Sequence, residues 1–213
     1  MSFDTVALWY RALETIAFGS ALQQARIACL GEIGSPARAL IVGEGNGRFL
    51  AELLQRQPLI RIDCVDSSER MLDLARRQVL ERNPDEIRRV AFFRHDVVTW
   101  TPNDRYDLIV THFFLDCFGT REAGHIVAKL AQAAAPGATW LLADFKVPEA
   151  GFARFHARAW LAVMYWFFRC VAGIEARELV DPSPFLRTEG FTLTRQHLFR
   201  MGMVKSELWR KNS

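Results

Sequence analysis

The sequence predicts a single α/β domain built on a doubly wound, mostly parallel sheet. Apolar, strand-like runs alternate with helical patterns between about residues 38 and 143, an order that produces parallel strands with helices on both faces. The runs are almost wholly apolar, as expected for strands covered on both sides. The 213 residues, 50% of them hydrophobic and 24% charged, are enough for one well-buried core.

Each element follows from these patterns in order. The parallel strands are expected at residues 38–42, 60–65, 89–94, 106–111 and 138–143, with helices at 47–56, 68–82 and 121–135. Two further strand-like runs, 191–199 and 203–209, flank Gly202, and their short connection predicts an antiparallel pair. We therefore expect a Rossmann-like sheet with one antiparallel strand at its C-terminal edge and helices on both faces.

Two segments lie outside this core. Residues 4–30 predict a helical cap: Asp4 can begin a first helix, and Ser20-x-x-Gln23 forms a capping box for a second that ends at Gly31. Such a cap would cover a ligand cleft or simply pack on the edge of the sheet, and the sequence favours neither.

The sequence of residues 151–174 predicts an aromatic helical insert. Its uninterrupted apolar run, residues 159–168, is too short for a bilayer, which needs about 20 residues. The insert must bury its surface in the domain, in a homodimer or against a lipophilic substrate. We expect packing or a dimer contact first; the alternative is that Trp160, Met164 and Phe167 roof an apolar acceptor pocket.

The most informative motif is G-E-G-N-G at residues 43–47, directly after the first strand. Glycine adopts positive φ freely and has no side chain, so Gly43, Gly45 and Gly47 allow a ligand to approach the backbone. The helix that follows offers unpaired N–H groups at its start. Asp66 ends the second strand, where it can accept bonds from ribose hydroxyls, so the motif predicts a nucleoside-containing cofactor.

Glycine spacing selects among such cofactors. A dinucleotide site requires G-x-G-x-x-G, but Arg48 and Leu50 occupy the positions of the last glycine, and no lysine follows as in a P-loop. Residues 42–47 instead resemble the first motif, (D/E)xGxGxG, of the class I S-adenosylmethionine-dependent methyltransferases. Val42 stands where the family often has an acid, and Glu44 partly substitutes for it.

The resemblance extends over residues 37–145 and implies a cofactor site. V-D-S-S-E-R-M-L at 65–72 resembles the second motif, which assigns Asp66 to ribose and Ser67 and Met71 to its surroundings. Asp96 and Val97 would bind adenine, and Y-D-L-I-V at 106–110 resembles the fourth motif, with Thr111 at its end. The implied set of cofactor residues is Gly43, Glu44, Gly45, Gly47, Asp66, Ser67, Met71, Asp96, Val97 and Thr111.

Candidates for acid–base chemistry follow the fourth strand, at the edge where doubly wound folds bind ligands. A base helps methyl transfer only when the acceptor is a hydroxyl or a protonated amine. His112 has a suitable ordinary pKa, and Asp116 and Tyr165 are further candidates. We expect S-adenosylmethionine-dependent methyl transfer to a small, hydrophobic acceptor; the alternatives are a catalytically silent binder of this cofactor and an NAD(P)-dependent oxidoreductase.

Charge and cysteine content limit the kinds of partner and metal site that we expect. The 27 basic residues are scattered against 24 acidic ones, giving a net charge of +3, which does not predict nucleic-acid binding. Cys29, Cys64, Cys117 and Cys170 lie far apart, without a C-x-x-C pair, so neither a metal site nor a disulfide framework is expected. With no signal-like N-terminus and no transmembrane run, we expect a cytoplasmic protein.

Overall fold

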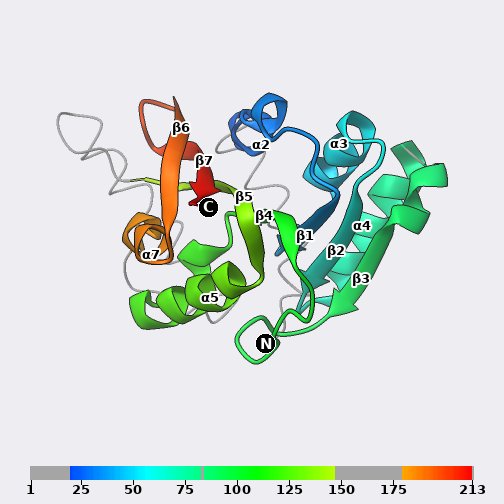
Figure 1. Ribbon diagram of the computed structural model, residues 1–213. Coiled ribbons are helices and arrows are strands. Elements are labelled where there is room, and N and C mark those ends of the chain that lie inside the picture. Colours follow the sequence, from blue (N-terminus) through cyan, green and yellow to red (C-terminus); the bar gives the residue numbers. More distant parts are fainter. Residues whose placement is uncertain (1–19, 83, 147–178, 213) are drawn as a thin grey trace.

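The computed structural model describes residues 20–82, 84–146 and 179–212, and its strands form one seven-stranded sheet (Figure 1). The strand order is β3-β2-β1-β4-β5-β7-β6. The strands are β1 (Arg38–Val42), β2 (Arg61–Asp66), β3 (Val90–Arg94), β4 (Tyr106–His112), β5 (Ala134–Phe145), β6 (Phe191–Phe199) and β7 (Val204–Lys211). Strands β1 to β5 are parallel, whereas β7 runs antiparallel to both β5 and β6. The predicted sheet, with one antiparallel strand in its C-terminal edge, is confirmed, and β6 lies outside β7.

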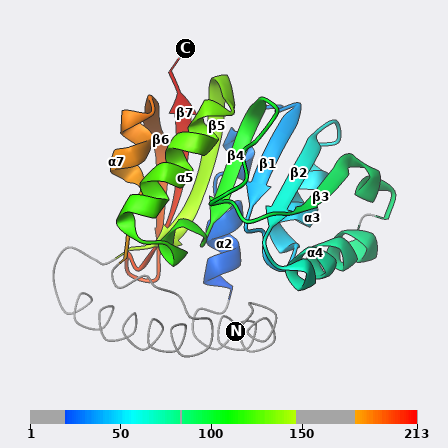
Figure 2. The ribbon, with the colours of Figure 1, turned by 90° about the horizontal axis from the view of Figure 1, so that it is seen from below.

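Helices cover both faces of this sheet. The α-helices are α2 (Ala21–Ile27), α3 (Arg48–Arg56), α4 (Glu69–Arg82), α5 (Thr120–Gln132) and α7 (Ser183–Thr188). Short 3₁₀ helices are η1 (Leu30–Glu32), η2 (Pro84–Arg89) and η3 (Leu115–Cys117). Helices α2, α3 and α4 lie on one face, and α5 and α7 on the other (Figures 1 and 2). None of the helices in the three described ranges is long and apolar enough to cross a membrane.

Alternate residues of the inner strands face two apolar layers, one on each side of the sheet. Leu40 and Val42 of β1 pack in the layer that contains Trp140, whereas Ile41 packs in the layer that contains Phe49 of α3. Strands β1, β2 and β4 are buried almost throughout. The expected cover on both faces therefore holds for these inner strands.

Strand β3 differs from this expectation. It is the edge strand of the sheet, and Ala91, Phe93 and Arg94 are exposed. Its apolar sequence suggested burial on both faces, but only the face with Val90 and Phe92 packs against the apolar layer that contains Phe49 of α3. Arg76 of α4 partly covers it, with the guanidinium 4.8 Å from the centroid of the Phe92 ring.

The boundary between α5 and β5 also differs from the prediction. Helix α5 ends at Gln132 and β5 begins at Ala134, so Pro136 and Gly137 lie inside the strand rather than in a turn before it. Strand β4 pairs through Tyr106 with Ala134 and then through Leu108 with Thr139, which leaves a bulge on β5. A bulge tolerates proline, which cannot donate a ladder hydrogen bond.

The capping box predicted at Ser20 is not formed. Ser20 has helical backbone angles and makes no side-chain bond to the backbone of α2; its Oγ accepts a bond from Nε2 of Gln24 at 3.3 Å. Helix α2 ends at Ile27, before the expected end at Gly31. The predictions for residues 4–19 and for the insert 151–174, with Tyr165, fall outside the described residues.

Helix α7 was not anticipated from the sequence. Pro182 precedes it and Pro184 lies in its first turn, where the missing N–H of proline costs nothing. The carboxylate of Asp181 accepts bonds from Oγ of Ser183 at 2.7 Å and from its backbone N–H at 3.2 Å. The sequence D-P-S-P at 181–184 is thus typical of the start of a helix. The hairpin predicted around Gly202 is confirmed, with its turn between β6 and β7.

Candidate cofactor and acceptor site

The carboxyl ends of the parallel strands bring most of the predicted site residues to one edge of the sheet. Strand β1 has β2 on one side and β4 on the other, so the order of strands reverses direction beside β1. In open α/β sheets, ligands bind at such a reversal. The glycine loop follows β1, Asp66 ends β2, and His112 ends β4.

The three glycines of the loop have positive φ, at +69°, +72° and +79° for Gly43, Gly45 and Gly47, but their missing side chains serve different purposes. A Cβ on Gly43 would meet the Phe114 ring at 2.3 Å, and one on Gly47 would meet the Ala75 Cα at 2.5 Å. A Cβ on Gly45 would meet no described atom within 4 Å. The open face that a ligand can approach is therefore that of Gly45, whereas Gly47 serves the packing of α3 against α4.

Glu44 is buried and binds the start of α3. Its Oε1 accepts a bond from the backbone N–H of Leu50 at 3.0 Å, and the N–H of Phe49 also donates to this carboxylate. Burial raises the pKa of Glu44 to about 7, although the two N–H donors and the positive charge of Arg26 oppose this change. The Glu44 carboxyl group thus accepts a hydrogen bond at the start of α3 and also titrates near neutral pH.

Asp66, which we predict to bind ribose, ends β2. Oδ1 of Asp66 accepts a bond from the backbone N–H of Ser68 at 2.9 Å, and Asp66 is partly exposed. Ser68, not Ser67, binds the start of α4, since its Oγ accepts a bond from the N–H of Met71 at 3.3 Å. Ser67 is exposed and Met71 partly exposed, so both stay accessible beside Asp66.

The end of β3 lies next to Asp66. The backbone N–H of His95 donates to the Asp66 carbonyl at 3.1 Å. Asp96 is exposed, and its Oδ1 accepts a bond from the N–H of Val98 at 2.9 Å. Val97 is buried, with its carbonyl accepting a bond from Lys129 Nζ at 2.8 Å. The structure therefore brings Asp66 and Asp96 to neighbouring strand ends, as predicted.

Thr111 does not join this group. Its side chain is fully buried, and its Oγ1 accepts a bond from the indole Nε1 of Trp140 at 2.8 Å. This places Thr111 in the core between β4 and β5, where it satisfies a buried N–H. The prediction that Thr111 contacts the cofactor is thus corrected by the structure.

His112 lies at the edge but in an unusual environment. It is buried, and its ring makes an edge contact with Phe49, with centroids 4.5 Å apart. Its Nδ1 has no hydrogen-bond partner within the described part of the chain. Burial, and then the positive charge of Arg26, hold the pKa of His112 well below its ordinary value. The imidazole is therefore neutral at neutral pH and holds an additional proton poorly.

Asp116 belongs to η3, just beyond β4. It is buried, and burial raises its pKa to about 6. The Cys117 thiol donates to Oδ1 of Asp116 with a separation of 3.7 Å between sulfur and oxygen. The charge of Asp116 in turn helps to raise the pKa of Asp144 in β5. A carboxyl group of this kind is ionised at neutral pH yet basic enough to accept a proton.

Aromatic rings line the chain between His112 and α5. Phe113 has a φ of +51°, a strained conformation for an aromatic residue. Its ring lies 5.1 Å from that of Phe145, and the Phe114 ring lies 5.0 Å from that of Phe118. We call these four residues the aromatic wall; Phe113 and Phe145 are buried, whereas Phe114 and Phe118 are partly exposed near Asp116.

Two charged residues of this region were missed in the sequence. Arg26 of α2 is buried, with its guanidinium 5.1 Å from the Phe113 ring centroid; a lone arginine inside an apolar helical pattern was the available signal. Asp144 is fully buried near the end of β5. Asp144 directly follows the apolar run 140–143, just as Asp66 follows an apolar run, so its position at a strand end could have marked it as a candidate site residue.

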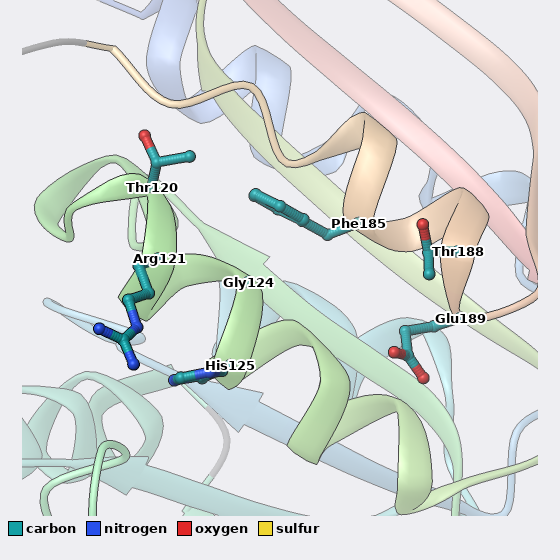
Figure 3. Close-up of a pocket in the computed structure, with 7 residues that line it drawn as sticks. All are labelled: Thr120, Arg121, Gly124, His125, Phe185, Thr188 and Glu189. Atoms are coloured by element: carbon teal, nitrogen blue, oxygen red, sulfur yellow. The ribbon is translucent and has the colours of Figure 1, made fainter.

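A separate open depression of about 430 Å³ lies between α5 and α7 (Figure 3). Its lining includes Arg121 and His125 from α5, Phe185 from α7 and Glu189 directly after α7. None of the residues predicted for cofactor or acceptor lines it. We therefore place the candidate site at the carboxyl edge of the sheet and not in this depression.

Comparison with known proteins identifies the fold. A family model described as a methyltransferase domain matches residues 40–140, and no curated protein sequence matches the chain. An O-methyltransferase family protein from Burkholderia thailandensis is 18% identical, with a TM-score of 0.70 over 96% of this chain and 60% of that one. Mitomycin 7-O-methyltransferase MmcR is 20% identical, with a TM-score of 0.70 over 99% and 61% of the two chains.

A third similar structure contains a product of the cofactor. N-methyltransferase NodS from Bradyrhizobium japonicum, in complex with S-adenosyl-L-homocysteine, is 13% identical, with a TM-score of 0.63 over 92% of this chain and 89% of that one. At these identities the structural likeness shows the fold alone, and the chain spans 60% of the length of the Burkholderia protein. The matching domain model covers the strands β2, β3 and β4, whose carboxyl ends build the site. Residues 40–140 thus match a methyltransferase domain, and the described part of the chain has the fold of the similar methyltransferase structures.

Proposed function

We propose that the protein transfers a methyl group from S-adenosylmethionine to a small, hydrophobic acceptor that carries a hydroxyl group. The observation that carries this proposal is the juxtaposition of three features at one edge of the sheet. The open face of Gly45 follows β1, next to the ends of β2 and β3 where Asp66 and Asp96 lie. The aromatic wall follows β4, and the buried Asp116 lies beside that wall.

The residues at the edge fit the cofactor. The exposed faces of Gly45, Asp66 and Asp96 suit a nucleoside, since a carboxylate at Asp66 can accept bonds from ribose hydroxyls. Arg26 and Glu44 are both buried and carry opposite charges when Glu44 is ionised, which suits an amino-acid zwitterion. When bound, S-adenosylmethionine supplies an electrophilic methyl group whose carbon–sulfur bond breaks with its electron pair remaining on sulfur.

The chain's own contribution to the reaction is positioning and proton transfer. Holding two reactants in line supplies much of the acceleration in such displacements, and the aromatic wall offers an acceptor an apolar surface. A hydroxyl acceptor must also lose its proton. Of the two candidate bases within the described residues we favour Asp116, because the neutral, buried His112 beside Arg26 resists the positive charge that it would gain.

The similar structures support the class of acceptor. MmcR is named as a 7-O-methyltransferase of mitomycin, a small molecule, and the Burkholderia protein as a member of an O-methyltransferase family. The aromatic wall of this chain suits an apolar acceptor of that size. NodS is named as an N-methyltransferase, so an amine acceptor is the second candidate.

The proposal is tested by methyl transfer from S-adenosylmethionine with a radioactive methyl group. The acceptors are phenols, hydroquinones, fatty acids and aliphatic amines, and products are extracted and counted. We expect transfer to the phenols or hydroquinones and a fall of about 10²- to 10⁴-fold in Asp116→Asn, as for the loss of a general base. Binding of S-adenosylhomocysteine without transfer to any of these acceptors would favour the catalytically silent alternative.

A further inference from the structure

The ring of Phe114 packs on the backbone of the glycine loop. A Cβ built on Gly43 would lie 2.3 Å from Cδ2 of this ring and 3.0 Å from its Cγ, so the ring takes the space that a side chain at position 43 would need. Gly43 directly follows β1, whereas Phe114 lies just beyond β4. The ring is partly exposed and also contacts Phe118 edge-on, with centroids 5.0 Å apart. One side chain thus joins the cofactor loop to the aromatic wall.

The backbone on both sides of Phe114 holds its ring in this place. The N–H of Phe113 donates to the Ala143 carbonyl at 2.7 Å, directly after the last paired residue of β4. The Phe114 carbonyl accepts a bond from the N–H of Cys117 at 3.2 Å, at the start of η3. Between these two bonds the chain turns through Phe113, whose φ of +51° is costly for an aromatic residue. Strain of this kind is typical of functional sites, where it places a side chain that the function needs.

Phe114 covers the middle of the proposed site. Strand β1 lies between β2 and β4 (Figure 2). Asp66, proposed for ribose, ends β2, and Asp116, the proposed base, follows β4. Neighbouring strands are about 4.8 Å apart, so the ends of β2 and β4 are separated by roughly 10 Å. A sulfonium group that is attached to the ribose and faces the acceptor therefore belongs near the end of β1, where the Phe114 ring covers Gly43.

An aromatic face can attract this positive charge without a charge of its own. The π electrons make the face of a ring negative, and cations bind it within about 6 Å of the centroid. The neighbouring Phe113 ring already has such a partner, since the guanidinium of Arg26 lies 5.1 Å from its centroid. Within residues 20–82, 84–146 and 179–212, no lysine or arginine stacks on the ring of Phe114. Its face therefore has no cationic partner from the described residues.

We propose that Phe114 is a specificity residue, which receives the sulfonium group of S-adenosylmethionine on its ring and so distinguishes the charged cofactor from its neutral product, S-adenosylhomocysteine. This inference rests on the proposed function. The product has no positive charge, so its contact with the ring is weaker and it leaves the site more readily than the cofactor does. Phe118 orients the ring of Phe114 through their edge contact and does not itself contact the sulfonium.

The test changes the charge distribution of the ring while its shape stays nearly the same. Phe114 is replaced by monofluoro-, trifluoro- and pentafluorophenylalanine, because each added fluorine draws electrons from the face of the ring and weakens its attraction for a cation. The same series at Phe118, which is also partly exposed, is the matched control. Calorimetric titration measures the Kd of S-adenosylmethionine and of S-adenosylhomocysteine for each variant. No acceptor is present, so the measurement does not depend on methyl transfer.

We expect the Kd of S-adenosylmethionine to rise at each step of the Phe114 series, by about 2- to 30-fold between phenylalanine and the pentafluoro ring. The Kd of S-adenosylhomocysteine should stay within a factor of two, and the Phe118 series should change neither constant. A flat response at Phe114, or a response at Phe118 in its place, would overturn the inference. An equal loss for both ligands at Phe114 would do the same, because the ring would then contact the cofactor without sensing its charge.

A second measurement separates the ring from the carboxyl groups near it. Glu44 directly follows Gly43, Asp116 lies two residues beyond Phe114, and both are buried. Burial raises the pKa of Glu44 to about 7 and that of Asp116 to about 6, so both groups are largely neutral at pH 5. The charges of the sulfonium and of the ring do not titrate. The preference for S-adenosylmethionine over S-adenosylhomocysteine should therefore be the same at pH 5 and pH 8, and the same in Glu44→Gln. A preference that disappears at pH 5 or in Glu44→Gln would assign the discrimination to the acids and contradict the inference.

The wild type distinguishes failure of this inference from failure of the proposed function. If it binds neither ligand, the proposed function is wrong; if it binds both and fluorination of Phe114 has no effect, only the present inference is wrong. Urea unfolding checks that each variant folds. If the pentafluoro variant does not, the monofluoro and trifluoro rings give the same trend. Phe114→Leu, which has no ring, should then lose affinity for S-adenosylmethionine alone, whereas Phe118→Leu should keep the preference of the wild type.

Discussion

Burial determines the chemistry of three titratable side chains at the carboxyl edge of the sheet. Glu44 and Asp116 are acids whose pKa values burial raises to about 7 and about 6. His112 is a base whose pKa burial lowers. In each case the low-dielectric surroundings favour the neutral form. The acids thus become suitable proton acceptors near neutral pH, whereas the histidine becomes a weaker one.

The effect of burial on the pKa of Glu44 can be tested by measuring protein stability at two pH values. Its folded pKa of about 7 lies above the ordinary value of 4.5, so its contribution to stability is present below pH 4.5 and is lost as the pH rises through 7. Gln at this position keeps an acceptor for the Leu50 N–H and carries no charge. We expect Glu44→Gln to be more stable than the wild type at pH 8, by on the order of 3 kcal/mol, and about equally stable at pH 4.

Urea unfolding of both proteins at the two pH values measures this difference. A gain that is the same at pH 4 and pH 8 would mean that the charge of Glu44 is not its origin.

The variant Thr111→Val tests whether Thr111 serves the core and not the cofactor site. In Thr111→Val the Trp140 indole N–H loses its acceptor while the side chain keeps its shape. Leaving a buried donor unsatisfied costs about 1–3 kcal/mol, so the variant should unfold at lower urea concentration. Its affinity for S-adenosylhomocysteine, measured by calorimetry, should stay within a factor of two. A large loss of affinity in a folded variant would return Thr111 to the binding site.

The glycine loop shows how one short motif serves three elements. Gly43 makes room for Phe114, which follows β4, and Gly47 makes room for Ala75 of α4, so that α3 and α4 pack closely. Gly45 keeps an open face toward the edge of the sheet. The motif therefore fixes the packing of the helices as well as the place of the ligand.

Alanine at Gly45 and Gly47 should separate these effects. At Gly45 the substitution forces an alanine to a φ of +72°, at a cost of about 1–2 kcal/mol. At Gly47 the same conformational cost adds to a contact of 2.5 Å with the Ala75 backbone, so unfolding should be distinctly easier than in Gly45→Ala. Gly45→Ala should fold yet bind S-adenosylhomocysteine more weakly, since its methyl group enters the open face.

Urea unfolding and calorimetry of the two variants measure both quantities. Equal stability of the two variants would contradict the packing contact at Gly47. Unchanged affinity in Gly45→Ala would move the ligand away from the loop.

At the scale of the whole molecule, the two faces of the sheet support different parts of the site. Helices α3 and α4 begin beside the glycine loop and Asp66, on the side of the cofactor residues (Figure 1). Helix α5 and its preceding 3₁₀ helix hold Asp116 on the other face, where Asp144 of β5 also lies near Lys205. The carboxyl edge is where these two halves meet.

Most of this arrangement could be predicted because it depends on local sequence patterns. Apolar runs locate the inner strands, and residues such as Asp66 mark their ends. The full burial of Asp144 could not be predicted, since it depends on how other elements pack over the end of β5. The exposure of residues in β3 could not be predicted either, because the sequence of a strand does not show whether the strand lies at the edge of the sheet. Thr111 was misplaced because the sequence does not show that Trp140 needs its hydroxyl.

Calorimetric titration with S-adenosylhomocysteine, with NADH as the competing ligand, tests the central claim that the carboxyl edge is a site for this cofactor. The wild type should bind S-adenosylhomocysteine with one site per chain and should not bind NADH. Asp66→Ala should bind about 10- to 150-fold more weakly, the loss expected for a hydrogen bond to a charged group, while its urea unfolding stays close to that of the wild type. Unchanged affinity in a folded Asp66→Ala, or binding of NADH in place of S-adenosylhomocysteine, would contradict the account.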